Sequence, residues 1–184
     1  INKYKIDKNE FNMEYAIKTA DIYAKSTGIR CMVVGGDGNT LYDTCGTGKC
    51  LFCSSISYTE SQKKLCNSAH LYGSYQAERF GGKYVFFCPL GLVHWASPII
   101  TDGIMKGSLI SGPVHMVEPD DFLIDEILKK NKVSETKLKG FVKLIKEIQV
   151  VSPDRVNSLS ETLMIMASYI SHKGNNVFNQ TRDL

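Results

Sequence analysis

The spacing of apolar residues near the N-terminus predicts an amphipathic helix. Within EFNMEYAIKTADIYAKS, Met13, Ile17, Ala20 and Ala24 recur at steps of four, three and four, which places them on one face of a helix. A glycine soon after this stretch marks the expected helix end. The next residues, RCMVV, GGDGN and TLYDT, are typical of a strand, a turn and a returning strand, so a β-hairpin is expected here.

The middle of the chain predicts a second helix followed by more strands. YTESQKKLCNSAHLYGSYQAERF begins with Thr59 as a candidate N-cap and runs to a Gly-Gly stop. KYVFFC and GLVHWASPII are rich in the aromatic and β-branched residues that favour strands. Asp102-Gly103 is a strong hairpin signal, and IMKGSLISGPVHM follows it as a returning strand. Residues 30–116 therefore predict an antiparallel sheet interrupted by one helix.

From Glu118 onward the pattern becomes helical. EPDDFLIDEILKKN opens with proline and acids and closes with lysines, as the helix dipole favours, and SETKLKGFVKLIKEI carries one apolar face. The last segment holds a seam of apolar residues at heptad spacing: Val156, Leu159, Leu163, Met166 and Ile170. Because this heptad seam covers only about two heptads, we expect the helix either to pack on its own domain or to meet a second subunit.

Together these elements predict an α/β (α+β) fold. Its centre is an antiparallel sheet with flanking helices, and a helical extension follows at the C-terminal end. The expected divisions are a domain over residues 10–118, a helical extension over 119–172, and a polar tail or linker over 173–184. A chain of 184 residues is long enough to bury a substantial core.

Composition and charge narrow the function classes. The net charge is only +3, and the lysines alternate with acids, so a nucleic-acid-binding stripe is not expected. No apolar run approaches the roughly 18 residues of a membrane helix, and INKYKIDKNE has no signal-peptide core. Six cysteines without such a signal favour a reducing cytoplasm, where clustered thiols serve as ligands or reactive groups.

Three of these cysteines stand in CGTGKCLFC, beside two glycines and a lysine. A phosphate-binding loop is excluded, because Asp43 occupies the place of its first glycine and Cys50 follows Lys49. The pair Cys50 and Cys53 forms a C-x-x-C, so a thiol redox protein is one hypothesis. A thioredoxin-like site would place this pair at a helix start within a βαβ unit, whereas the surroundings here predict a hairpin.

The other hypothesis is a bound metal. Cys50, Cys53, Cys66 and Cys88 could supply four thiolates to zinc or to an iron–sulfur cluster. His70 lies four residues after Cys66 on the same helix face and could replace one thiolate. Packing of Cys66 and Cys88 in the core is the alternative for these two. Since no zinc-protease or deaminase motif is present, we expect no catalytic activity.

Four stretches, taken in order, carry a resemblance to a known family. FC at 52–53, LCNSAH at 65–70, YVFFCPLGL at 84–92 and SPIITDGIMKGSLISGPV at 97–114 resemble the PocR sensory domain, a bacterial ligand-sensing module related to PAS and GAF domains. With the N-terminal helix and hairpin, the resemblance covers about residues 10–118. The family's three cysteines correspond to Cys53, Cys66 and Cys88, while Cys45 and Cys50 are additional here.

The resemblance implies a cytoplasmic sensor of small organic compounds, such as diols or simple hydrocarbon derivatives. It also implies that the shared cysteines bind a metal or shape the ligand pocket. The output, a histidine kinase or an AraC-type DNA-binding domain, is expected outside these residues. Ligand or redox change would then bias the C-terminal helices, and a homodimer formed through the heptad seam would pass the signal on.

A pocket for such a ligand is expected between the curved sheet and its helices. Candidate lining residues on the predicted strands are Tyr84, Phe87, His94 and Trp95. Trp95 is the only tryptophan and could donate its indole N–H to a ligand. The alternative is that these aromatic residues simply fill the core.

Overall fold

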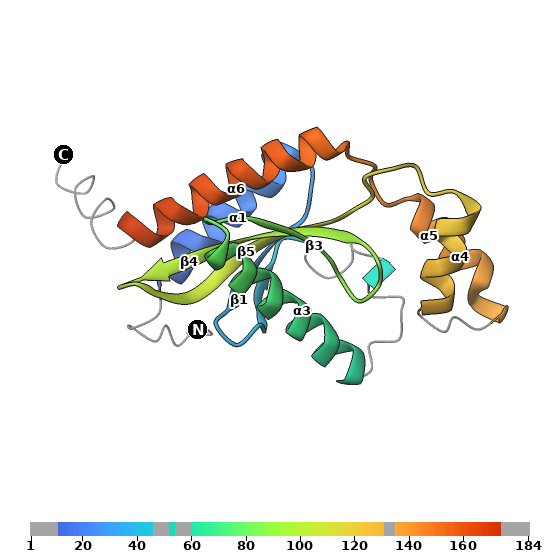
Figure 1. Ribbon diagram of the computed structural model, residues 1–184, viewed down its shortest axis with the longest axis horizontal. Helices are drawn as coiled ribbons and strands as arrows, with labels where there is room; N and C mark the ends of the chain where they lie inside the picture. The colour runs from blue at the N-terminus through green and yellow to red at the C-terminus, as the bar shows by residue number, and fades with distance from the viewer. Residues whose placement is uncertain (1–10, 46–51, 54–59, 131–134, 174–184) are drawn as a thin grey trace.

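The computed structural model describes residues 11–45, 52–53, 60–130 and 135–173 (Figure 1). Its centre is a five-stranded antiparallel sheet with the strand order β2-β1-β5-β4-β3. The strands are β1 (Cys31–Gly35), β2 (Thr40–Asp43), β3 (Tyr84–Phe87), β4 (Val93–Thr101) and β5 (Ile104–Val114). The predicted α/β fold with a central antiparallel sheet is confirmed.

Both predicted hairpins are present. β1 pairs with β2, and β4 pairs with β5 through the turn at Asp102 and Gly103. Both turn residues have positive φ, 53° and 75°, which matches the right-handed twist of the strands that they join. β5 then pairs with β1, so the N-terminal hairpin joins the later strands in one sheet.

The helices follow the predicted pattern closely. They are α1 (Met13–Thr27), α3 (Glu60–Arg79), α4 (Asp121–Lys130), α5 (Leu138–Lys146) and α6 (Pro153–Lys173). α1 begins after Asn12, whose side chain accepts a hydrogen bond from the Tyr15 amide at 2.9 Å. It ends at Gly28, where φ is 73° and the amide bonds back to the helix. None of the described helices is long and apolar enough to cross a membrane.

The two faces of the sheet carry different helices. α1 and α6 lie on one face and α3 lies on the other (Figure 1). Because side chains alternate along a strand, β4 sends Trp95 to the α1 and α6 side and Ala96 to the α3 side. A third apolar cluster joins α4 and α5 to Phe52 and to the loop that follows β3.

The heptad seam of α6 packs on its own sheet. Val156, Leu163 and Ile170 are at most 2% exposed and share the core that Trp95 and Leu109 form from the strands. This packing agrees with the alternative in which the helix packs on its own domain, and a homodimer through this helix stays a prediction. α6 also belongs to the sheet's core, although it falls in the segment for which a helical extension was predicted.

Candidate functional site

Two buried imidazoles lie on the α3 side of the sheet. His70 comes from α3 and is 8% exposed, and His94 comes from β4 and is 3% exposed. The Phe86 ring stacks on His94 with a centroid distance of 5.8 Å. A Cβ at Gly112 would lie only 2.9 Å from the Cδ2 atom of His94. Glycine at this point of β5 therefore allows the imidazole to lie against the backbone.

Both histidines are neutral at pH 7. Burial lowers the pKa of His70 to about 4, and the positive charge of Arg30 acts in the same direction. Burial also lowers the pKa of His94 to about 3, with further contributions from His70 and Arg30. A neutral imidazole has one donor and one acceptor nitrogen, so each ring offers a lone pair as well as an N–H.

The tautomer of His70 follows from its neighbours. A hydrogen bond to the Gly38 backbone favours the protonated ring, whereas Nδ1 is buried and has no partner among the described residues. The bond to Gly38 therefore uses Nε2–H as its donor, and Nδ1 is left with its lone pair. An unpartnered buried acceptor is uncommon in folded proteins, and this one is free to accept a hydrogen bond from a bound molecule.

The turn between β1 and β2 holds His70 in place. A Cβ at Gly38 would collide with the Asn67 carbonyl oxygen of α3, and φ is 83° there, so only glycine allows this approach. The Asn67 side-chain amide also donates to Asn39 at 2.6 Å. α3 and the turn are thus in direct contact close to His70.

Arg30 lines an adjacent groove, and its positive charge also contributes to the lowered pKa of both histidines. Its Nε donates to the Asp43 carboxylate at 2.9 and 3.1 Å, and Nη2 completes the ion pair. This bidentate ion pair balances the positive charge of the guanidinium with the carboxylate of Asp43. The guanidinium still contributes to the lowered pKa of both histidines. Sequence reasoning missed this pair, although Arg30 and Asp43 flank the open ends of the predicted hairpin.

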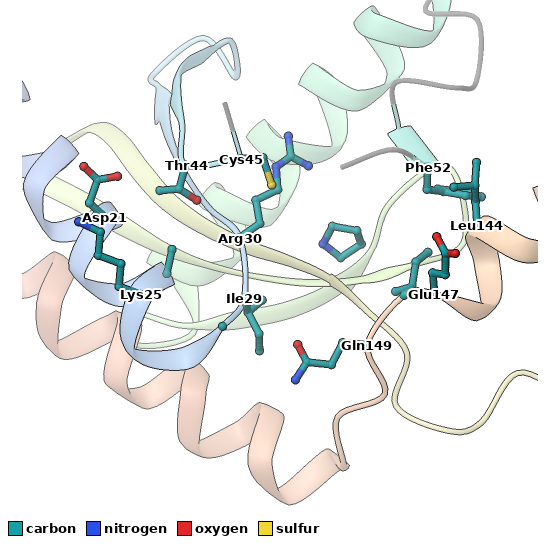
Figure 2. Close-up of a pocket in the computed structure, with 14 residues that line it drawn as sticks. Asp21, Lys25, Ile29, Arg30, Thr44, Cys45, Phe52, Leu144, Glu147 and Gln149 are labelled. Atoms are coloured by element: carbon teal, nitrogen blue, oxygen red, sulfur yellow. The ribbon is translucent and has the colours of Figure 1, made fainter. Parts of the chain in front are cut away.

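The groove is a cavity of about 650 Å³, and Figure 2 shows the residues around it. α1 supplies Asp21 and Lys25 to one side, and Leu144 of α5 and Glu147, the C-cap residue of that helix, lie on the other. Arg30 projects between these two walls in the close-up view. The cavity therefore carries charges of both signs together with apolar surface.

Cys88 lies near Cys53 and Cys66, but the described residues form no preorganised metal site. Cys88 is 7% exposed, and its pKa is raised to about 11 by burial, backed by the neighbouring Cys66. Cys53 packs on the same cluster as Cys88. Within the described ranges, no group of three or more His, Cys, Asp or Glu side chains is placed to hold a metal ion. Cys50 lies outside those ranges, so the predicted metal site stays a prediction.

The four predicted ligand-lining residues are not brought together. Trp95 faces α1, where its indole N–H donates to the Tyr23 hydroxyl at 3.0 Å, while His94 faces α3. Phe87 is 66% exposed, and Tyr84 packs against two aromatic side chains at the outer edge, with centroid distances of 6.1 and 5.8 Å. His94 lies on the α3 side of the sheet, and His70 contributes to the lowered pKa of His94.

An antiparallel sheet with helices on both faces defines an α/β domain. The model of the family described as "Sensory domain found in PocR" matches residues 10–175. The chain belongs to this family of sensory domains, as its resemblance predicted, and the match continues beyond residue 118 to include α6.

Two further comparisons complete the picture. A solved structure, the targeted domain of a protein described as a transcriptional regulator of the IclR family, is 16% identical with a TM-score of 0.43. The alignment covers 87% of this chain and 94% of that one. No curated protein matches the chain in sequence.

Proposed function

We propose that this sensory domain is a cytoplasmic signal-input module that binds a small neutral organic ligand on the α3 side of the sheet. The observation that carries the proposal is the buried, unpartnered Nδ1 of His70. Leaving a buried acceptor without a hydrogen bond costs about 1–3 kcal/mol. A ligand hydroxyl that donates to Nδ1 recovers this free energy.

The surroundings of His70 favour a neutral ligand over a charged one. Both histidines are uncharged at pH 7, and Asp43 already matches the charge of Arg30. Apolar side chains, among them Phe86 and Ile110, pack on this face of the sheet. A short alcohol or diol combines the donor and the apolar skeleton that such surroundings accept.

The domain is proposed to act as an input without catalytic activity of its own. Its signal would pass to an output domain such as a histidine kinase or an AraC-type DNA-binding domain. Membership of the PocR sensory family supports the sensor role. The partner domain and a homodimer remain proposals.

Two substitutions at His70 separate the ligand acceptor from the structural bond. His70→Gln keeps a donor near the position of Nε2 and removes the acceptor at Nδ1, whereas His70→Asn keeps an acceptor and removes the donor to Gly38. Straight-chain alcohols and diols of two to six carbons, with the matching carboxylates and amines, are titrated into the protein. Isotope-labelled imidazole nitrogen shifts in NMR report binding.

We expect alcohols or diols to shift Nδ1 of His70 while the carboxylates and amines do not. His70→Gln should weaken this binding about tenfold or more with little loss of folding stability. His70→Asn should retain more of the binding and lose more stability. Absence of any alcohol binding, or equal binding by His70→Gln, would overturn the proposal.

A second candidate role is metal ligation at the cysteines. It is favoured by the electrostatic coupling between Cys66 and Cys88 and by the packing of Cys53 on the cluster that contains Cys88. Cys50 would supply a fourth thiolate. Elemental analysis and a visible absorption spectrum of protein purified without oxygen test it. Iron with sulfide, or stoichiometric zinc, would support ligation, and absence of metal would exclude it.

A further inference from the structure

β4 is shared between the two sides of the sheet. Among the strands, it has the most extensive contact with α3 on one face and with α6 on the other. His94 and Trp95 are consecutive residues, and they project to opposite faces. A displacement of this strand on the His94 side therefore moves Trp95 beneath α1 and α6.

A hydrogen-bonded series connects Trp95 to α6. The indole N–H of Trp95 donates to the Tyr23 hydroxyl at 3.0 Å, and that hydroxyl donates to the Leu159 carbonyl at 3.0 Å. Trp95 and Tyr23 are 0% and 1% exposed, so water does not compete for these bonds. Burial raises the pKa of Tyr23 to about 12, which keeps its hydroxyl a donor at every physiological pH.

β4 holds α6 at a second point near the other end of the helix. The strand pairing shifts register between Ile99 and Ile100. The Ile100 amide donates to the Ser171 hydroxyl at 2.8 Å, and this hydroxyl donates to the Ala167 carbonyl at 3.0 Å. Two polar attachments therefore fix the position of α6 along one strand.

We propose that β4 couples the His94 side of the sheet to α6 through Trp95, Tyr23 and the Leu159 carbonyl. Tyr23 is the positioning residue of this relay, because its hydroxyl joins β4 to α6 through α1. As a route for a ligand signal the relay rests on the proposed function. The mechanical link itself can be tested without any ligand.

Gly73 is a position at which a substitution can disturb the α3 side of the sheet. A Cβ at Gly73 would lie 2.5 Å from the Phe86 ring, and that ring stacks on His94. Gly73→Ala must therefore displace Phe86 and disturb His94, although Gly73 lies on the opposite side of the sheet from α6. Phe86→Leu disturbs the same stack if Gly73→Ala does not fold.

Tyr23→Phe removes only the hydroxyl of the relay. Tyr42→Phe is a matched control, because the Tyr42 hydroxyl also donates a hydrogen bond to α1, to Asp21 at 2.8 Å, outside the relay. Amide hydrogen exchange along α6 is measured in the wild type, Gly73→Ala, each tyrosine variant, and the two double variants. Fluorescence of Trp95, the only tryptophan, gives a second readout.

We expect Gly73→Ala to accelerate exchange in α6 about tenfold, and the same change in a Tyr23→Phe background to accelerate it less than about threefold. The Tyr42→Phe background should keep the full effect. If the exchange rates in α6 show that the effects of Gly73→Ala and Tyr23→Phe simply multiply, the relay is wrong. It is also wrong if neither Gly73→Ala nor Phe86→Leu changes exchange in α6. If no alcohol binds, the proposed ligand is wrong, but the coupling of Gly73 to α6 through Tyr23 is unaffected.

Discussion

At the scale of single residues, the chemistry of the site depends on uncharged side chains held in position by glycines. Gly38 brings a carbonyl to His70, and Gly112 allows His94 to lie against β5. The sequence identified His70 and His94 as candidates. It could not show that α3 covers the His94 side of the strand and α1 the Trp95 side, because these contacts join segments that are distant in the sequence.

The two histidines make folding sensitive to acid. Each folded-state pKa, about 4 for His70 and about 3 for His94, lies below the value of about 6.5 for an unfolded chain. The unfolded state therefore binds more protons, so stability is full above pH 6.5 and falls as the pH drops toward 4. Between pH 7 and pH 5 we expect a loss of about 2 kcal/mol per histidine, measured by urea unfolding.

A variant of one histidine tests the assignment. His94→Phe removes one titrating ring, so the loss between pH 7 and pH 5 should shrink by about half. An unchanged slope would show that His94 does not supply this acid sensitivity.

At the scale of elements, α6 is a one-sided helix bound to its own sheet. Leu163 is 0% exposed, while Ile165 is 67% exposed on the opposite side of the helix. The three-four spacing predicted the buried positions of this helix. It could not tell what covers them, because a sheet and a second helix accept the same apolar stripe.

Alanine substitutions on the two sides of α6 should differ strongly. Leu163→Ala leaves a cavity in the core and should cost about 2–5 kcal/mol of unfolding free energy. Ile165→Ala should change it by less than about 0.5 kcal/mol. Chemical denaturation measures both. Equal costs would mean that α6 does not pack on the sheet as described.

At the scale of the whole molecule, two of the three apolar clusters are expected to differ in stability. The larger one unites the sheet with α1 and α6, and another unites α4, α5 and the loop near Cys88. α4 and α5 span only 10 and 9 residues, so most of their stability comes from packing. The cluster around Cys88 is therefore expected to open before the sheet does.

Two buried thiols report on these clusters separately. Cys88 belongs to the α4 and α5 cluster and Cys31 to the core of the sheet, with 7% and 0% exposure. In rising urea, alkylation followed by peptide mass spectrometry should label Cys88 at a lower concentration than Cys31. A shared midpoint would instead indicate one cooperative unit.

The sequence by itself determined the elements, their order and the two hairpins, because apolar spacing and turn residues act locally. It also determined the family, through short stretches that keep their residues and order. Only the tertiary structure decided that α6 closes the sheet's own core, and that His70 keeps an open acceptor while Trp95 is bound to Tyr23. These depend on which distant side chains meet, since burial and hydrogen-bond partners follow from packing across the chain.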